Sequence, residues 1–175
     1  MTKIKTYNVL SLGLGVQSST LALMAKHKLI PMPDFAVFAD TGWELPWVYD
    51  YLEYIRPILP FEIIINKKNN GLRQSLVDSF VDKKGFASIP FQTESIIDKK
   101  GGKLRRQCTR EFKLDIIVKT VREKTGILKG EMAKNKIFVN QIIGISTDEA
   151  TRMSTSRIKY IKNDYPLIDL DMSRF

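Results

Sequence analysis

The sequence has very few of the residues that build disulfide bonds and histidine-containing metal sites. Its 175 residues include one cysteine, Cys108, and one histidine, His27. A single cysteine cannot form an internal disulfide, and this scarcity is typical of intracellular proteins. A four-cysteine iron–sulfur cluster cannot be built from one copy of such a chain. We therefore expect an intracellular protein without an iron–sulfur cluster.

Long apolar runs and internal repeats are also lacking. No apolar stretch approaches the length of a membrane span, and the N-terminus does not show the basic-then-apolar pattern of a signal peptide. Hydrophobic residues make up 43% of the chain, which is typical of a globular protein. We expect one domain over residues 1–175 and no membrane partner.

Acidic residues are in short supply. The chain carries 19 Asp and Glu against 28 Lys and Arg, a formal net charge of +9. Such a surplus favours anionic partners, namely nucleotides, nucleic acid or polyphosphates. A role in solubility alone is the alternative, and net charge does not decide between the two.

Short apolar runs and helix-like segments alternate along the chain. The pattern predicts strands over residues 7–12, 35–39, 61–65, 137–145 and 157–161, and helices over 18–28, 46–56, 71–81 and 109–125. This alternation predicts a parallel sheet with crossover helices. The segment 83–107 is predicted to be a long loop or hairpin. Thr109 is expected to cap the last helix, whose inner face would carry Leu114, Ile117, Val118 and Val121.

The stretch "VLSLGLGVQSST" combines a strand, a glycine-rich turn and a helix start. Gly13 and Gly15 are expected to allow close approach and positive φ, while Ser18 and Ser19 are placed to cap the helix or donate to a phosphate oxygen. The stretch lacks the Gly-Lys-Ser/Thr ending of a P-loop and the third glycine of a dinucleotide fingerprint. An ordinary strand-to-helix turn therefore remains an alternative to an anion loop.

The second predicted strand ends in "FADTGWELP". In open α/β sheets an acidic residue at this edge commonly meets the ribose or adenine of a ligand, which is the interpretation for Asp40. Helix capping is the alternative. Thr41, Gly42 and Trp43 crowd the same edge, and Trp43 and Trp47 are expected to lie half in the core and half against a ligand.

Five blocks in this order resemble a known family: "SLGLGVQSSTLALMA", "VFADTGWE", "RRQCTREFK", "IGISTDEATRM" and "YPLID". They are similar to the phosphoadenosine-phosphosulfate (PAPS) reductase-like branch of the PP-loop ATP pyrophosphatases, in the adenine nucleotide α-hydrolase-like superfamily, and especially to its small bacteriophage members. The resemblance covers nearly the whole chain. It implies a Rossmann-like (HUP-type) α/β fold, with a parallel five-stranded sheet and helices on both faces. It also implies a cytoplasmic location in a bacterial cell or phage-infected host.

The resemblance implies ATP or a PAPS-like nucleotide as ligand. In ATP-using relatives the α-phosphorus is attacked, AMP passes to an acceptor and pyrophosphate leaves. The aspartate of the family loop is Gln17 here, which weakens the case for Mg²⁺ held by this loop; Mg²⁺ brought by ATP stays open. Sulfur-transferring relatives carry cysteines beyond the "YPLID" block, whereas this sequence ends at Phe175. A missing cysteine-bearing segment and a version without the cluster are both open, and the reductase reaction is not expected.

The resemblance assigns roles to particular residues. Lys113, Asp148 and Arg152 are the expected catalytic residues. The expected nucleotide-binding residues are Ser11, Gly13, Gly15, Gln17, Ser18, Ser19, Asp40, Thr41, Gly42, Arg106, Cys108, Thr109 and Gly144. Lys113, Arg106 and Arg152 would neutralise phosphate or sulfate charge. Asp148 and Glu149 are adjacent and point apart on any regular element, so one is expected to orient Arg152 and the other to take a proton or hold a metal.

Three functions compete at this point. The first is an enzyme that hydrolyses the α-phosphate of ATP or transfers the adenylyl group. The second is a tRNA or DNA modification enzyme of the thiolase or sulfur-modification type, which the positive charge favours. The third is a non-catalytic nucleotide-binding module, which Gln17 favours. The sequence leaves the acceptor and the oligomeric state open, a homodimer included.

Overall fold

The computed structural model describes residues 4–68, 71–81, 92–94, 101–103, 109–127 and 137–174. Five parallel strands form one sheet in the order β3-β2-β1-β6-β7. Their bounds are β1 (Lys5–Ser11), β2 (Phe35–Asp40), β3 (Glu62–Lys67), β6 (Ile137–Ile143) and β7 (Ile161–Asp164). The expected α/β, Rossmann-like fold is therefore confirmed, and so is the placement of β2 beside β1.

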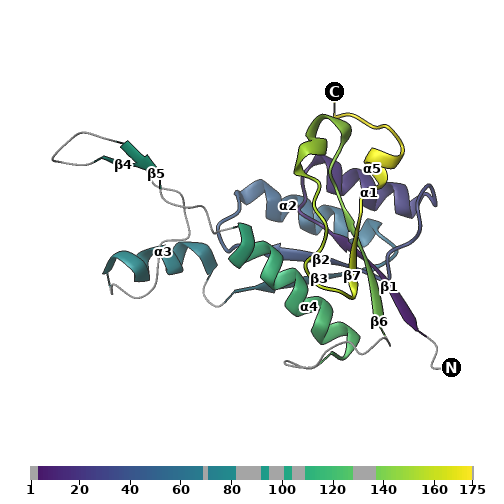
Figure 1. The fold of residues 1–175 in the computed structure, drawn as a ribbon, viewed down its shortest axis with the longest axis horizontal. Coiled ribbons are helices and arrows are strands. Elements are labelled where there is room, and N and C mark those ends of the chain that lie inside the picture. The colour runs from purple at the N-terminus through teal and green to yellow at the C-terminus, as the bar shows by residue number, and fades with distance from the viewer. Residues whose placement is uncertain are drawn as a thin grey trace.

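The helices follow the predicted alternation. They are α1 (Val16–Lys26), α2 (Pro46–Ile55), η1 (Arg56–Ile58), α3 (Gly71–Val81), η2 (Arg110–Leu114), α4 (Asp115–Thr125), η3 (Thr147–Arg152) and α5 (Pro166–Asp169). Within the segment 83–107, β4 (Gln92–Glu94) and β5 (Gly101–Lys103) form an antiparallel pair, as the hairpin alternative expects. Figure 1 draws this pair and α3 to the left of the five-stranded sheet.

Each face of the sheet carries its own hydrophobic core. Leu10 and Phe38 pack with Leu21 of α1 and Leu52 of α2, while Val9 and Val37 pack with Ile117 and Val121 of α4. Figure 1 shows α1 and α2 on one side of the sheet and α4 on the other. Since successive strand residues point to opposite faces, a strand covered on both sides must be apolar throughout. The run "FAVFA" in β2 meets this requirement, and all five of its residues are buried.

The start of the helical segment after residue 109 differs from the prediction. Thr109 already has helical φ and ψ of −62° and −41°, and its side chain makes no capping hydrogen bond. The first turn, η2, is π-helical, so its side chains are turned relative to those of an α-helix. Leu114 consequently remains 49% exposed, whereas Ile117 and Val121 are buried. The cap and the inward position of Leu114 were wrong, and the inner face of α4 was right.

The last strand begins later than predicted. The sequence predicts a strand over residues 157–161, but β7 spans Ile161–Asp164. The backbone N–H of Val139 donates to the carbonyl of Tyr160 at 2.8 Å, so pairing with β6 begins only there. Ile158 and Tyr160 instead pack against the core on the α4 side. Their apolar alternation therefore reflects burial of a turn.

The order of the strands places the candidate site. The chain moves from β1 outward to β2 and β3, then returns to the other side of β1 as β6 and β7. The direction of winding thus reverses between β1 and β6, and ligands of open α/β sheets bind at the carboxyl ends of the strands at such a point. In the described part of the chain, no helix is both long and apolar enough to cross a membrane.

Candidate nucleotide site

The loops after β1 and β6 touch at the point where the sheet reverses. Gly144, directly after β6, lies against the first turn of α1. A Cβ at this position would come within 2.7 Å of the Ser18 backbone nitrogen and 3.0 Å of the Gln17 carbonyl carbon. Only glycine fits there without moving backbone. Ser11, at the end of β1, accepts a hydrogen bond from the Gln141 amide at 2.9 Å and so lies between the two strands.

The glycine loop has an open side. Gly13 and Gly15 are exposed, and a Cβ built on Gly15 would meet nothing within 4 Å. The residue with positive φ is Leu14, at 56°, and not Gly15, whose φ is −85°. The prediction that Gly13 and Gly15 supply positive φ was therefore wrong at both positions. Burial of the Leu14 side chain in the core on the α1 side, about 1.5–3 kcal/mol, offsets the cost of about 1–2 kcal/mol for this backbone conformation.

The first turn of α1 offers backbone donors to an anion. The first hydrogen bond at this end of the helix runs from Ser19 N to the Gly15 carbonyl at 3.0 Å, and the preceding N–H groups have no partner within the helix. Ser18 donates its hydroxyl to the same carbonyl at 3.2 Å, and no side chain caps the helix. Both serines are more than nine-tenths buried, and in the described part of the chain the Ser19 hydroxyl has no hydrogen-bond partner. The open side is thus lined by backbone rather than by serine hydroxyls.

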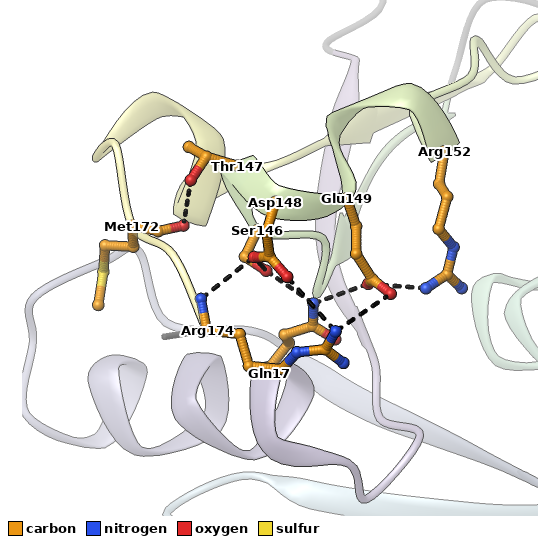
Figure 2. Close-up of polar contacts among 8 residues, drawn as sticks. All are labelled: Gln17, Ser146, Thr147, Asp148, Glu149, Arg152, Met172 and Arg174. Carbon is orange, nitrogen blue, oxygen red and sulfur yellow. Dashed lines mark hydrogen bonds and ion pairs between the residues drawn. The ribbon is translucent and has the colours of Figure 1, made fainter.

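Gln17 connects the two loops (Figure 2). Its side-chain Nε2 donates to Ser146 Oγ and to Glu149 Oε2, both at 2.8 Å. Ser146 in turn donates to Asp148 Oδ1 at 2.5 Å. These bonds join two loops that are far apart in sequence, and they hold the ends of β1 and β6 close together. Gln17 therefore acts as a donor to one carboxylate and one hydroxyl of the loop after β6.

Two arginines balance the two carboxylates. Arg152 approaches Glu149 at 2.7 Å, as expected for one of the adjacent acids, and Arg174 lies 3.4 Å from Asp148 and 3.9 Å from Glu149. The hydrogen bond from Ser146 is the main cause that lowers the pKa of Asp148, and the bond from Gln17, followed by that from Arg152, lowers the pKa of Glu149. Both acids are therefore ionised at neutral pH.

An irregular turn brings these acids to one network. Glu149 has non-helical φ and ψ of −118° and 19° inside η3, so the expectation that adjacent acids point apart, which holds on regular elements, does not apply. Residues 172–174 bind across the same turn: Thr147 N donates to the Met172 carbonyl at 3.0 Å, and Arg174 N donates to Asp148 Oδ1 at 3.1 Å. Sequence reasoning missed Arg174, because nothing in its local pattern relates it to residue 148.

The described residues do not fit a metal site held by the protein. Among them, no group of three or more His, Cys, Asp or Glu side chains is placed to hold a metal ion. The carboxylates of Asp148 and Glu149 accept from Ser146, Gln17 and the two arginines.

Asp40 is engaged in a local turn at the end of β2. Its Oδ1 accepts from the Gly42 backbone N–H at 2.7 Å and from the Tyr49 hydroxyl at 2.8 Å. Burial, together with this bond to Asp40, raises the pKa of Tyr49. The alternative role of Asp40 as a helix cap was wrong, since Leu45 occupies the cap position of α2 and no side chain bonds to it.

The turn after β2 meets the start of α3 and η2. Gly71 lies so close to this turn that a Cβ on it would be 2.8 Å from the Thr41 carbonyl, and both Gly42 and Gly71 have positive φ. Thr41 Oγ1 donates to Glu44 Oε1 at 3.0 Å, and Lys113 Nζ lies 3.3 Å from the same oxygen. This ion pair brings Lys113 to the carboxyl end of β2, the strand that pairs with β1.

The remaining predicted residues divide into three groups. Arg152 is 64% exposed at its side chain and Thr109 is exposed at the start of η2. Arg106 and Cys108 lie outside the described residues. Trp43 and Trp47 are 50% and 63% exposed and pack against neither hydrophobic core of the described residues, so the part of the expectation that places them in the core was wrong.

The comparisons with known proteins add no relative. No family model, no curated protein and no solved structure matches this chain.

Proposed function

We propose that the chain binds an adenine nucleotide at the carboxyl edge of its sheet and cleaves it between the α- and β-phosphates. An oxygen nucleophile, from water or an acceptor, would bond to the α-phosphorus, and the bond from that phosphorus to the bridging oxygen would break. Pyrophosphate would leave with the bonding electrons. The products would be AMP or an adenylylated acceptor, with pyrophosphate.

The open side of the glycine loop is the observation that carries this proposal. It adjoins the N-terminus of α1, where unpaired N–H groups and the helix dipole favour anions, and it lies at the switch point of the sheet. Gly15 leaves room for a phosphate, whereas Gly144 holds the opposite loop in contact. The five sequence blocks that resemble the PP-loop family support an adenine nucleotide as this anion.

The charged groups around the loop suit phosphoryl chemistry. Such reactions need cations where charge develops on phosphate oxygens and on the leaving pyrophosphate. Arg152 and Arg174 lie beside the loop, paired with Glu149 and Asp148, and Lys113 of η2 reaches the turn after β2. In the proposal the arginines bind the pyrophosphate end, and Asp40, Thr41 and Gly42 lie along the adenosine.

Analysis of reaction products tests this function. The purified chain is incubated with ATP and Mg²⁺, and nucleotides are separated by anion-exchange chromatography. We expect AMP and pyrophosphate, and a loss of rate of about 100- to 1,000-fold in Lys113→Ala, the range for removing one preorganised charge-stabilising group. Lys124→Ala is the matched control, because Lys124 is equally exposed, 45% against 44%, and pairs with Glu62 at the opposite edge of the sheet. ADP and phosphate as the products would contradict the proposal.

One observation favours a second candidate, a nucleotide-binding module without turnover. The loop has Gln17 where the pattern of the resembling family has an aspartate, so it lacks that carboxylate. The Gln17 amide binds Glu149 and Ser146 instead. Such a module would bind ATP in calorimetry and return it unchanged in the product analysis.

A further inference from the structure

Both tryptophans of the chain are exposed beside the candidate site. Trp43 follows the turn at the end of β2 and is 50% exposed, and Trp47 lies in the first turn of α2 and is 63% exposed. Leu45 between them is 54% exposed. Tryptophan side chains are highly buried on average, so three large apolar side chains exposed within five residues favour a binding surface.

Two lysines from other elements reach the residues on either side of Trp43. A Cβ built on Gly42 would lie 3.1 Å from Cδ and 3.7 Å from Nζ of Lys67, which ends β3. On the other side, Glu44 pairs with Lys113 of η2 at 3.3 Å. In the described part of the chain the Lys67 ammonium has no ion pair. Trp43 is therefore an exposed indole with an ammonium group near each of its chain neighbours.

The neighbouring carboxylates do not cancel this arrangement. Glu44 already accepts a hydrogen bond from Thr41 and pairs with Lys113. Asp40 accepts hydrogen bonds from the Gly42 N–H and the Tyr49 hydroxyl. The ammonium group of Lys67 therefore stays without an ion pair among the described residues. The chain as a whole has a net charge of +9. Proteins bind single strands by stacking a base on an exposed aromatic ring and by contacting a neighbouring phosphate with a cation, and Trp43 and the unpaired Lys67 beside Gly42 offer one group of each kind.

We infer that Trp43 and Lys67 form a binding surface for single-stranded nucleic acid, with Trp43 stacking on an unpaired base and Lys67 contacting an adjacent phosphate. This surface deepens the proposed function, because it lies at the edge where that function places the nucleotide and so names the acceptor class. The sequence analysis gave Lys67 no assignment and expected Trp43 to lie half in the core and half against a ligand.

Tryptophan fluorescence tests the inference without requiring turnover. Trp47→Phe leaves Trp43 as the only tryptophan, and Trp43→Phe leaves Trp47. Each variant is titrated, without ATP, with a single-stranded oligodeoxynucleotide of about ten nucleotides, a length within the site sizes of known single-strand binders. We expect the oligonucleotide to quench Trp47→Phe strongly and Trp43→Phe weakly. AMP alone at saturating concentration should leave both emissions unchanged.

Affinity and salt dependence separate stacking from phosphate contact. Trp43→Ala should weaken oligonucleotide binding about 5- to 140-fold, the range for losing one base–aromatic stack. Lys67→Ala should lower the slope of log K against log salt by about 0.7, whereas Lys124→Ala should leave it unchanged. Circular dichroism of each variant verifies that the fold is intact, and Tyr54→Ala, which removes an exposed aromatic side chain from α2, controls for general loss of aromatic surface.

Three results would overturn the inference. Quenching of Trp43 by AMP but not by the oligonucleotide would show that this indole contacts the mononucleotide base. Unchanged Trp43 emission with the oligonucleotide would show that no base stacks there. An unchanged salt slope in Lys67→Ala would remove the phosphate contact. Failure of ATP cleavage with intact quenching would instead refute only the proposed function, so the two can fail separately.

Discussion

A methyl group added at Gly144 and one added at Gly15 should have opposite effects, although both glycines lie in the same site. At Gly144 the new Cβ would be 2.7 Å from the Ser18 nitrogen, while ordinary contacts begin at 3.4 Å, so the backbone of one of the two loops must shift by about 0.7 Å. At Gly15 nothing lies within 4 Å, and its φ and ψ of −85° and 171° suit alanine.

The expected stabilities follow from these contacts. Gly144→Ala should lose about 1–3 kcal/mol, the usual cost of overpacking. For a chain of this length that lowers the Tm by about 2–12 °C. Gly15→Ala should keep the Tm or raise it, because alanine reduces the freedom of the unfolded chain by about 0.4–1 kcal/mol. Thermal unfolding without nucleotide, followed by circular dichroism, measures both.

Nucleotide binding completes the comparison. If a phosphate occupies the open side of the loop, Gly15→Ala should weaken ATP binding at least about tenfold, or ~1.4 kcal/mol, in calorimetry. A stable Gly15→Ala variant that binds ATP as the parent does would show that the phosphates lie elsewhere. A Gly144→Ala variant with unchanged Tm would refute the close contact between the loops.

The remaining predictions concern the polar groups at the two strand ends. Gln17→Glu should lower the Tm and weaken ATP binding, because it sets a carboxylate against Glu149; Gln17→Met, similar in size and neutral, is the control, and equal behaviour of the two would contradict the reasoning. The pKa values of Asp148 and Glu149 lie below their ordinary 3.8 and 4.5, so their contribution to stability is present above those values and is lost as pH falls through the lower folded ones. Urea unfolding at a series of acidic pH values measures this loss, which should shrink in Gln17→Met. The hydroxyl of Tyr49 should titrate above 10.0 by ultraviolet absorbance, and this rise in pKa should become smaller in Asp40→Asn, since burial is its main cause and Asp40 adds to it.

Much of the fold follows from local pattern. The continuous apolar run "FAVFA" predicts β2, and α3 begins and ends at the residues predicted for the helix over 71–81. The strand after Tyr160 was not predictable from its own polar sequence "IKND", since pairing with β6 determines where it starts. The π-helical turn at Arg110–Leu114 likewise leaves no signal in residue periodicity.

The site was predictable only in part. Strand–glycine–helix order locates the loop, and the order of the strands then confirms that it lies at the switch point. The contacts that define its geometry join distant parts of the chain: Gln17 with Glu149, Arg174 with Asp148, and Lys67 with Gly42. Local patterns do not encode such pairs, because tertiary packing decides them.

The position of bond cleavage tests the central claim most directly. ATP is incubated with the chain and Mg²⁺ in water enriched in ¹⁸O, and the phosphorus products are read by ³¹P NMR, in which ¹⁸O shifts the resonance of the phosphorus that it joins. Attack at the α-phosphorus, as we propose, would place ¹⁸O in AMP and leave the pyrophosphate unlabelled. Label in pyrophosphate or in inorganic phosphate would show attack at another phosphorus and would contradict the account.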